Sequence, residues 1–162
     1  MAGSPLRTTS QAAVPAPGDA IQVVTFFLAG EEYALAITAI REIIGPAEPT
    51  RLPHAPDPVI GLINLRGVVI PVFDPKRWFG LGAEAGPAPT TIIAEWQGEA
   101  FGLAVDSVRQ VVWLPRDQID PPSNRFEKRS PYIAGLGKVQ GRLLILLDLA
   151  ALFAEVEDAG AP

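Results

Sequence analysis

An internal repeat is the feature of this sequence that most limits what it can fold into. The stretch GEEYALAITAIREII at residues 30–44 aligns with GEAFGLAVDSVRQVV at residues 98–112. A second stretch, GLINLRGVVIPVFD at residues 61–74, aligns with GLGKVQGRLLILLD at residues 135–148. Two aligned blocks in the same order indicate an internal duplication. Convergence of both halves on a common hairpin pattern is the alternative.

Each half predicts the same run of local structure. Apolar runs on either side of Gly30, and again on either side of Gly98, are typical of paired β-strands. The isoleucines within residues 40–44 recur at i, i+3 and i+4, which favours a short helix. The aligned residues 108–112 carry valines at the same spacing, and these β-branched side chains leave helix and strand both open.

A proline-rich connector and a second hairpin complete each half. The hairpins turn at residues 66–67 and 140–141, where a glycine supplies the positive φ angle. Asp74 and Asp148 follow the hairpins, and we expect each to cap a short helix. The sequence therefore predicts a mostly β protein of two small related barrels, which share a core because each is too small to be stable alone. The repeat by itself assigns one barrel to each half.

Composition excludes several classes of function. The 162 residues are 48% hydrophobic and carry a net charge of −5, which permits a core and argues against binding nucleic acid. The basic stretch RFEKR at residues 125–129 is short and interrupted, so we expect an exposed loop. The absence of cysteine excludes disulfides and thiolate metal sites. No apolar run approaches the roughly 20 residues that span a membrane, and residues 1–20 lack the apolar core of a secretory signal. We expect a disordered leader on a cytoplasmic protein.

Side chains suited to catalysis are scarce. His54 is the only histidine, and without a carboxylate or second histidine at ligand spacing we expect it to lie on the surface. Asp74 and Asp148 could be a catalytic pair, but their shared position before a helix favours capping. The serines occur in no nucleophile motif: Ser4, Ser10, Ser107, Ser123 and Ser130. We expect a binding module that has no cofactor and no metal, and that is not an enzyme.

A binding site is expected where the halves differ. Glu42 stands opposite Gln110, Asn64 opposite Lys138 and Arg66 opposite Gln140. The first half alone therefore has a carboxylate at the end of its expected helical segment and a guanidinium at the hairpin turn. If the hairpin folds back beside residues 40–44, Arg66 and Glu42 can form a bidentate ion pair. Two unrelated exposed charges are the alternative.

The run REII, followed by TRLPHAPDPVIGLINLRGVVIPVFD, strongly resembles the CheW family, the coupling proteins of bacterial chemotaxis arrays. The resemblance continues through FGLAVDSV and YIAGLGKVQGRLLILLD and covers about residues 21–155, which leaves a leader at 1–20 and a flexible tail at 156–162. It implies two SH3-like five-stranded β-barrels with exchanged strands, so that barrels and sequence halves do not coincide, and a closing C-terminal helix. Pro75 replaces the leucine usual in the family, which is harmless at the first helical position.

The resemblance also implies a function. Members of the family are non-catalytic adaptors that join a CheA-type histidine kinase to the cytoplasmic helical tips of methyl-accepting chemoreceptors, in arrays at the membrane. A groove between the barrels would receive the receptor tip, and a separate apolar surface would pack on the regulatory domain of the kinase. Glu42 and Arg66 match the acidic and arginine positions near the receptor groove. The residues in the same matched motifs are Ile40, Ile43, Gly61 and Asn64.

Three other functions compete with this one. A CheW-like adaptor of a different chemosensory system, such as one that controls surface motility, would have the same motifs. A small barrel that binds extended peptides or nucleic acid is disfavoured by the acidic balance and by the lack of a series of aromatic side chains for stacking. An enzyme comes last, for want of reactive groups.

Overall fold

The computed structural model describes residues 19–53, 59–81, 88–122 and 130–158. His54, the basic stretch 125–129 and residues 1–18 of the leader lie outside the described residues. The strands are β1 (Ala20–Leu28), β2 (Glu31–Ala36), β3 (Ile40–Ile44), β4 (Val59–Leu65), β5 (Val68–Phe73), β6 (Thr90–Trp96), β7 (Glu99–Val105), β8 (Ser107–Pro115), β9 (Ile119–Asp120), β10 (Ile133–Val139) and β11 (Arg142–Leu147). The α-helices are α1 (Pro75–Phe79) and α2 (Leu149–Asp158), and the 3-10 helices are η3 (Ile37–Ala39), η4 (Arg116–Gln118) and η6 (Ser130–Tyr132).

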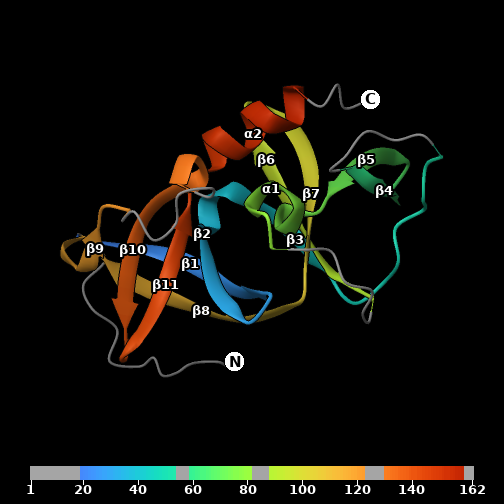
Figure 1. Ribbon diagram of the computed structural model, residues 1–162. Coiled ribbons are helices and arrows are strands. Elements are labelled where there is room, and N and C mark those ends of the chain that lie inside the picture. The colour runs from blue at the N-terminus through green and yellow to red at the C-terminus, as the bar shows by residue number, and fades with distance from the viewer. Residues whose placement is uncertain (1–18, 54–58, 82–87, 123–129, 159–162) are drawn as a thin grey trace.

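The strands form two curled sheets that lie side by side, with α2 running across the top of both (Figure 1). Sheet one has the order β8-β1-β2-β11-β10-β9, and sheet two has the order β3-β6-β7-β5-β4. Each sheet therefore takes strands from both halves of the chain, which confirms the exchanged barrels. The assignment of one barrel to each half is wrong. Sheet two has the five strands expected, whereas sheet one gains a sixth because the two-residue β9 pairs with β10.

Equivalent pairings recur in the two sheets. In sheet one β11 pairs in parallel with β2, and in sheet two β5 pairs in parallel with β7 at the aligned positions. Asp120 of β9 pairs with Leu136 of β10 in sheet one. The aligned bridge joins Thr50 to Leu62 of β4 in sheet two. Because long-range pairings match as well as sequence blocks, the structure favours duplication over convergence on a hairpin pattern.

The segment at residues 40–44 is strand β3, and the prediction of a short helix there is wrong. β3 pairs antiparallel with β6, and a bulge between Ile40 and Glu42 adds one residue to the strand. The isoleucine spacing resembled a helix because the burial of β3 alternates while its residue types do not: the half-buried position 42 holds a glutamate and the exposed position 43 an isoleucine. β-branched side chains suit a strand wherever a partner is available, and β6 provides one. The aligned valines belong to β8, which settles the open alternative in favour of a strand.

Both helices begin as the sequence predicts. Asp74 accepts a hydrogen bond from the Lys76 backbone N–H at 3.0 Å, and Pro75 occupies the first turn of α1. Asp148 accepts one from the Ala151 N–H at 3.3 Å. The helix α2 continues to Asp158, beyond the boundary expected at residue 155. The two aspartates thus cap different helices.

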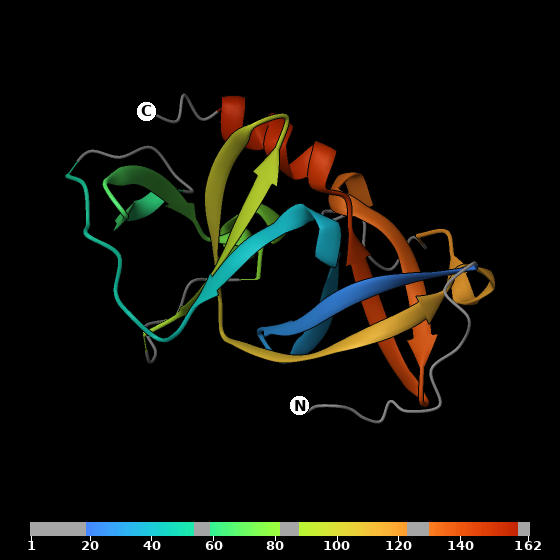
Figure 2. The ribbon, with the colours of Figure 1, turned by 180° about the vertical axis from the view of Figure 1, so that it is seen from behind.

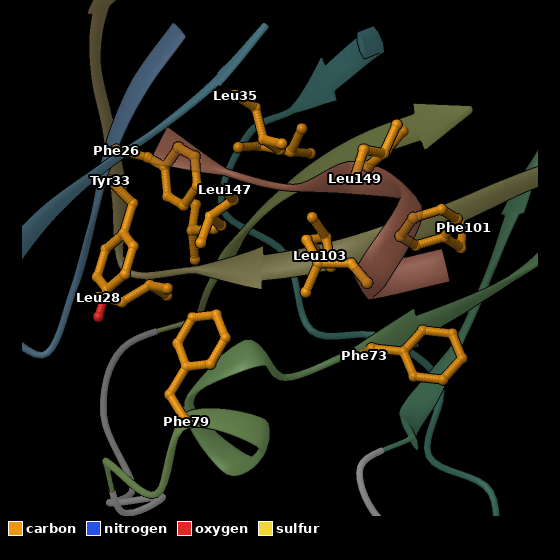
Figure 3. Close-up of a cluster of buried hydrophobic side chains, with 14 of the residues drawn as sticks. Phe26, Leu28, Tyr33, Leu35, Phe73, Phe79, Phe101, Leu103, Leu147 and Leu149 are labelled. Atoms are coloured by element: carbon orange, nitrogen blue, oxygen red, sulfur yellow. The ribbon is translucent and has the colours of Figure 1, made fainter. Parts of the chain in front are cut away.

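One hydrophobic core joins the two sheets, as expected for barrels that cannot fold alone. Side chains from β1, β2 and β11 of sheet one meet side chains from β5, β6 and β7 of sheet two, and both helices add to the same cluster. Figure 3 shows them converging from opposite sides: Phe26, Leu28, Tyr33, Leu35, Phe73, Phe79, Phe101, Leu103, Leu147 and Leu149. A smaller cluster around Val23 and Leu114 fills the interior of sheet one. Seen from behind, β1 and β8 run together along sheet one while β3 lies against β6 (Figure 2).

Candidate partner-binding site

The predicted ion pair is present. Arg66 Nη2 donates to Glu42 Oε1 at 2.7 Å, in a single hydrogen bond and not the bidentate pair that we expected. Glu42 lies on β3 and Arg66 on the β4–β5 turn, at opposite edges of sheet two. The pair therefore connects the two edges where the sheet curls round on itself. The Arg66 side chain is 72% exposed and the Glu42 side chain 27%, so the guanidinium remains accessible to a partner.

The shape of the turn does not explain why arginine stands at position 66. Arg66 has a φ of 52° and Gly67 a φ of 86°. The aligned Gln140 and the first turn residue of each other hairpin, Ala29 and Gln97, have nearly the same φ angles. Because alanine and glutamine adopt this conformation equally, the arginine is explained by its side chain and by the pair it makes with Glu42.

Two of the predicted site residues shape the hairpin that carries Arg66. The Asn64 side-chain oxygen accepts a hydrogen bond from the Gly67 N–H at 2.9 Å, which holds the turn. Gly61 lies under the segment before β4, where an added Cβ would be 2.5 Å from the Thr50 carbonyl oxygen. The pattern that singled out these residues thus has a structural explanation. Direct contact of either residue with a partner stays a prediction.

The two predicted isoleucines have different environments. Ile40 is partly buried and packs against the shared core. Ile43 lies on the outer face of β3 and is 41% exposed. Ile43 is therefore available to a partner, whereas Ile40 mainly supports β3.

A groove that the sequence did not reveal lies beside the ion pair. It has a volume of about 520 Å³ and lies between β5, the β6–β7 turn and the end of α2. Its lining combines apolar side chains with charged ones, and its accessible surface is more polar than apolar: Arg41, Val68, Val69, Ile70, Pro71, Gly98, Glu99, Ala100, Phe153, Val156 and Glu157. Val68 and Val69 are 56% and 58% exposed, the largest exposures among the described residues with large apolar side chains. All the strand residues in the lining belong to sheet two, so this groove differs from the one between the barrels that the family resemblance implies.

The ion pair and the groove are connected through the chain. Arg41 at the groove precedes Glu42, and Val68 follows Arg66 by two residues. The pair therefore anchors to β3 the hairpin that presents the apolar wall. Arg41 Nη2 donates to Glu95 Oε2 at 2.6 Å, which balances the positive charge at the groove. With Glu99 and Glu157 also in the lining, the rim is acidic.

The perturbed acidic groups have structural causes. Burial raises the pKa of Asp74, and the hydrogen bond from the Lys76 backbone N–H opposes this shift. Burial and a hydrogen bond to Glu155 raise the pKa of Tyr132 to about 12. Asp74 caps α1 and Tyr132 ties η6 to α2. Across the described ranges there is no cluster of three or more His, Cys, Asp or Glu side chains that could hold a metal.

A two-barrel fold whose site consists of a groove with apolar and charged lining, beside ion pairs, belongs to the class of binding modules. The model of the CheW-like domain matches residues 22–157, so the chain belongs to the CheW family. It is 34% identical over 161 residues to "Chemotaxis protein CheW" of Klebsiella aerogenes, covering 98% of this chain and 95% of that protein. "Chemotaxis protein CheW" of Thermotoga maritima is 30% identical over 137 residues, with coverage of 83% and 89%. The crystal structure of the scaffolding protein TtCheW from Thermoanaerobacter tengcongensis superposes with a TM-score of 0.73 at 32% identity, covering 80% of this chain and 89% of that one.

Proposed function

We propose that the protein is a non-catalytic adaptor that couples transmembrane chemoreceptors to a CheA-type histidine kinase in chemotaxis signalling. Similarity to proteins named as chemotaxis CheW, and to a structure described as a scaffolding protein, supports this function. The observation that carries it is the exposed groove beside the Arg66–Glu42 pair on a tightly packed double barrel. An adaptor works by presenting surfaces, and this chain presents one that is hollow, partly lined by apolar side chains and framed by charges.

The receptor tip is assigned to the face formed by the groove and the ion pair. Apolar residues of an amphipathic helix bind in hydrophobic grooves, and charges beside the groove fix the register. Ile43 on β3 is exposed, and the exposed Arg66 reaches the same strand from the opposite edge of sheet two through its pair with Glu42. Arg66 acts in two ways under this proposal, since it holds the hairpin through Glu42 and offers its free N–H groups to the receptor.

The regulatory domain of the kinase is assigned to a second surface. Three further exposed apolar side chains lie outside the groove, namely Ile37 on η3, Val111 on β8 and Leu143 on β11. Two of them belong to sheet one, so receptor and kinase would occupy different barrels. The proposal places the protein in the cytoplasm, recruited to receptor arrays. In the described segments no helix is both long enough and apolar enough to cross a membrane.

Co-purification with a CheA-type kinase and with a receptor cytoplasmic fragment tests the proposal. The wild-type chain should bind both, and simultaneous binding should bring kinase and receptor into one complex. Failure to bind either partner would overturn the proposed function. A strongly salt-dependent shift of DNA would instead favour a nucleic-acid-binding barrel.

Charge reversal at the ion pair tests the receptor surface. Arg66→Glu should abolish receptor binding while leaving kinase binding, and should lower the melting temperature by only a few degrees, because an exposed pair contributes about 0–1 kcal/mol. Glu42→Arg combined with Arg66→Glu should recover part of the stability if the two side chains interact directly. A collapse of the melting curve in Arg66→Glu would show that this residue acts mainly through the fold.

A further inference from the structure

The repeat permits a comparison of the groove with the equivalent place on sheet one. Three groove residues, Arg41, Val68 and Ala100, align with Arg109, Arg142 and Glu32. The comparison is structural as well as sequential, because β5 and β7 pair as β11 and β2 do. Each sheet therefore has the same site in its framework, occupied by different side chains.

On sheet one a charge cluster fills this site. The Glu32 side chain is only 6% exposed, and Arg142 approaches both of its oxygens, with Nε 3.0 Å from Oε1 and Nη2 3.3 Å from Oε2. Arg109 Nη1 lies 3.8 Å from Glu32 Oε1, and the Arg109 guanidinium sits 5.9 Å from the centre of the Phe27 ring. Two guanidinium groups and a carboxylate thus cover the strands.

On sheet two, two of the three charges are absent. Val68 and Ala100 stand where sheet one has Arg142 and Glu32, and neither can form an ion pair. Arg41 pairs with Glu95, the residue that aligns with Phe27. The strands beneath are left with an apolar, partly exposed covering.

The helices add a second difference. Phe79 of α1 packs on Tyr33 of sheet one with ring centres 5.6 Å apart, and the aligned Phe153 of α2 packs on Phe101 of sheet two at 5.9 Å. Both helices therefore dock in the same way. The helix α1 ends there, at Gly80 with a φ of 70°, whereas α2 runs on to Asp158 and places Val156 and Glu157 along the groove. Within the described segments, only sheet two has a helical wall at this site.

From these two differences we infer that the duplicated site has diverged into one closed and one open copy. Val68 and Ala100 keep the groove of sheet two open, while the Glu32–Arg142 pair closes its counterpart on sheet one. The occupant of the open copy is a partner's amphipathic helix with an aliphatic stripe and lysine or arginine on its flanks. The basic flanks follow from charge complementarity, because Glu99 and Glu157 on the rim are exposed and have no ion-pair partner among the described residues. This inference rests on the proposed function, in which the occupant is the receptor tip.

Transplanting the closing pair tests the inference. In the full-length chain, Val68→Arg with Ala100→Glu should close the groove, because the same pair is accommodated at the equivalent place on sheet one. Binding of the receptor cytoplasmic fragment should weaken at least tenfold, while kinase binding should stay within twofold of wild type. The matched control is Arg142→Val with Glu32→Ala, which removes the pair from sheet one and should leave receptor affinity within twofold.

Charge reversal on the rim provides a second variant that leaves the core untouched. Glu99→Lys with Glu157→Lys should weaken receptor binding several-fold and reduce its dependence on salt, with an unchanged melting curve. The inference is overturned if the transplanted pair or the rim reversal leaves receptor affinity unchanged, or if the sheet-one control weakens it as much. If the wild-type chain binds neither the kinase nor the receptor fragment, the proposed function is overturned instead. Failure of the inference and failure of the proposed function are therefore distinguishable.

Discussion

Replacement of Gly61 by alanine should destabilise the protein far more than the place of this residue in a predicted binding motif suggests. Gly61 is buried in β4, where the segment leading into the hairpin crosses directly above it. An added Cβ would lie 2.5 Å from the Thr50 carbonyl oxygen and 3.0 Å from the Pro49 Cβ. The first obstacle is backbone, which cannot move aside by a change of rotamer, so the crossing segment must shift.

The magnitude follows from what that shift disrupts. Thr50 and Leu62 exchange two backbone hydrogen bonds, each 2.8 Å long, and both involve the atoms that would have to move. Losing them costs about 1 kcal/mol each, and forcing a methyl group into a filled space costs about 1–3 kcal/mol. With some relaxation we expect Gly61→Ala to lower the free energy of unfolding by about 2–4 kcal/mol. At about 2–4 °C per kcal/mol for a chain of this size, the melting temperature should fall by about 5–15 °C.

Urea unfolding followed by circular dichroism and tryptophan fluorescence measures the effect, with two matched glycines as references. Gly45 has nothing within 4 Å of an added Cβ, so Gly45→Ala should be neutral or slightly stabilising. At Gly135, the aligned position in sheet one, an added Cβ would lie 2.6 Å from the Ile119 side chain and 3.0 Å from the Asp120 carbonyl oxygen. Gly135→Ala should therefore lower stability by an amount between those of Gly45→Ala and Gly61→Ala. If Gly61→Ala unfolds at the same urea concentration as Gly45→Ala, the segment around Thr50 does not constrain position 61 and the reasoning is refuted.

Three other outcomes are expected. Arg142→Ala leaves the buried Glu32 carboxylate without its closest partner and should cost about 2–4 kcal/mol in urea unfolding; joint replacement of both by methionine should cost less, and an equal cost would contradict this account. Asp74→Ala removes the cap of α1 and should cost about 1 kcal/mol, while Asp74→Asn should recover most of it; no loss in the alanine variant would refute the capping role. Since folding raises the pKa of Tyr132 to about 12, the folded state holds its proton while the unfolded tyrosine, with a pKa of about 10, loses it. Stability should therefore fall between pH 10 and 12, and Tyr132→Phe should remove that part of the pH dependence measured by urea unfolding.

The sequence predicted those features that depend on neighbours along the chain. The hairpin turns at residues 66–67 and 140–141, and the caps at Asp74 and Asp148, follow from local rules and are found where expected. The contact between Arg66 and Glu42 was also predictable, because the repeat showed both to be peculiar to the first half. The exchange of strands between barrels followed only from the resemblance to a known family, since nothing in a local pattern specifies which sheet a strand joins.

The features that escaped prediction depend on residues brought together from distant parts of the chain. The strand at residues 40–44 is fixed by β6, some fifty residues away, and its pattern was hidden because Glu42 is half-buried while Ile43 is exposed. The groove requires β5, the β6–β7 turn and the end of α2 to meet. A signal for it was nonetheless present, because the alignment places Val68 opposite Arg142 and Ala100 opposite Glu32. A charge pair present in one copy and missing from the other, such as Glu32–Arg142, therefore points to a binding site as well as the Glu42–Arg66 pair does.

Duplication with strand exchange has a physical consequence for an adaptor. Had each half formed its own barrel, the two barrels would be joined by a single crossing of the chain, and surfaces on different barrels could move independently. Here the chain crosses between the sheets twice, after β2 and between β7 and β8, and both α1 and α2 add side chains to the core that the sheets share. One continuous core, with Leu103 from sheet two and Leu147 from sheet one in the same cluster, fixes the barrels against each other. A helix bound on sheet two and a domain bound on sheet one would therefore be held at a set distance and angle. Divergence of the two equivalent sites then makes the surfaces different enough that each selects its own partner.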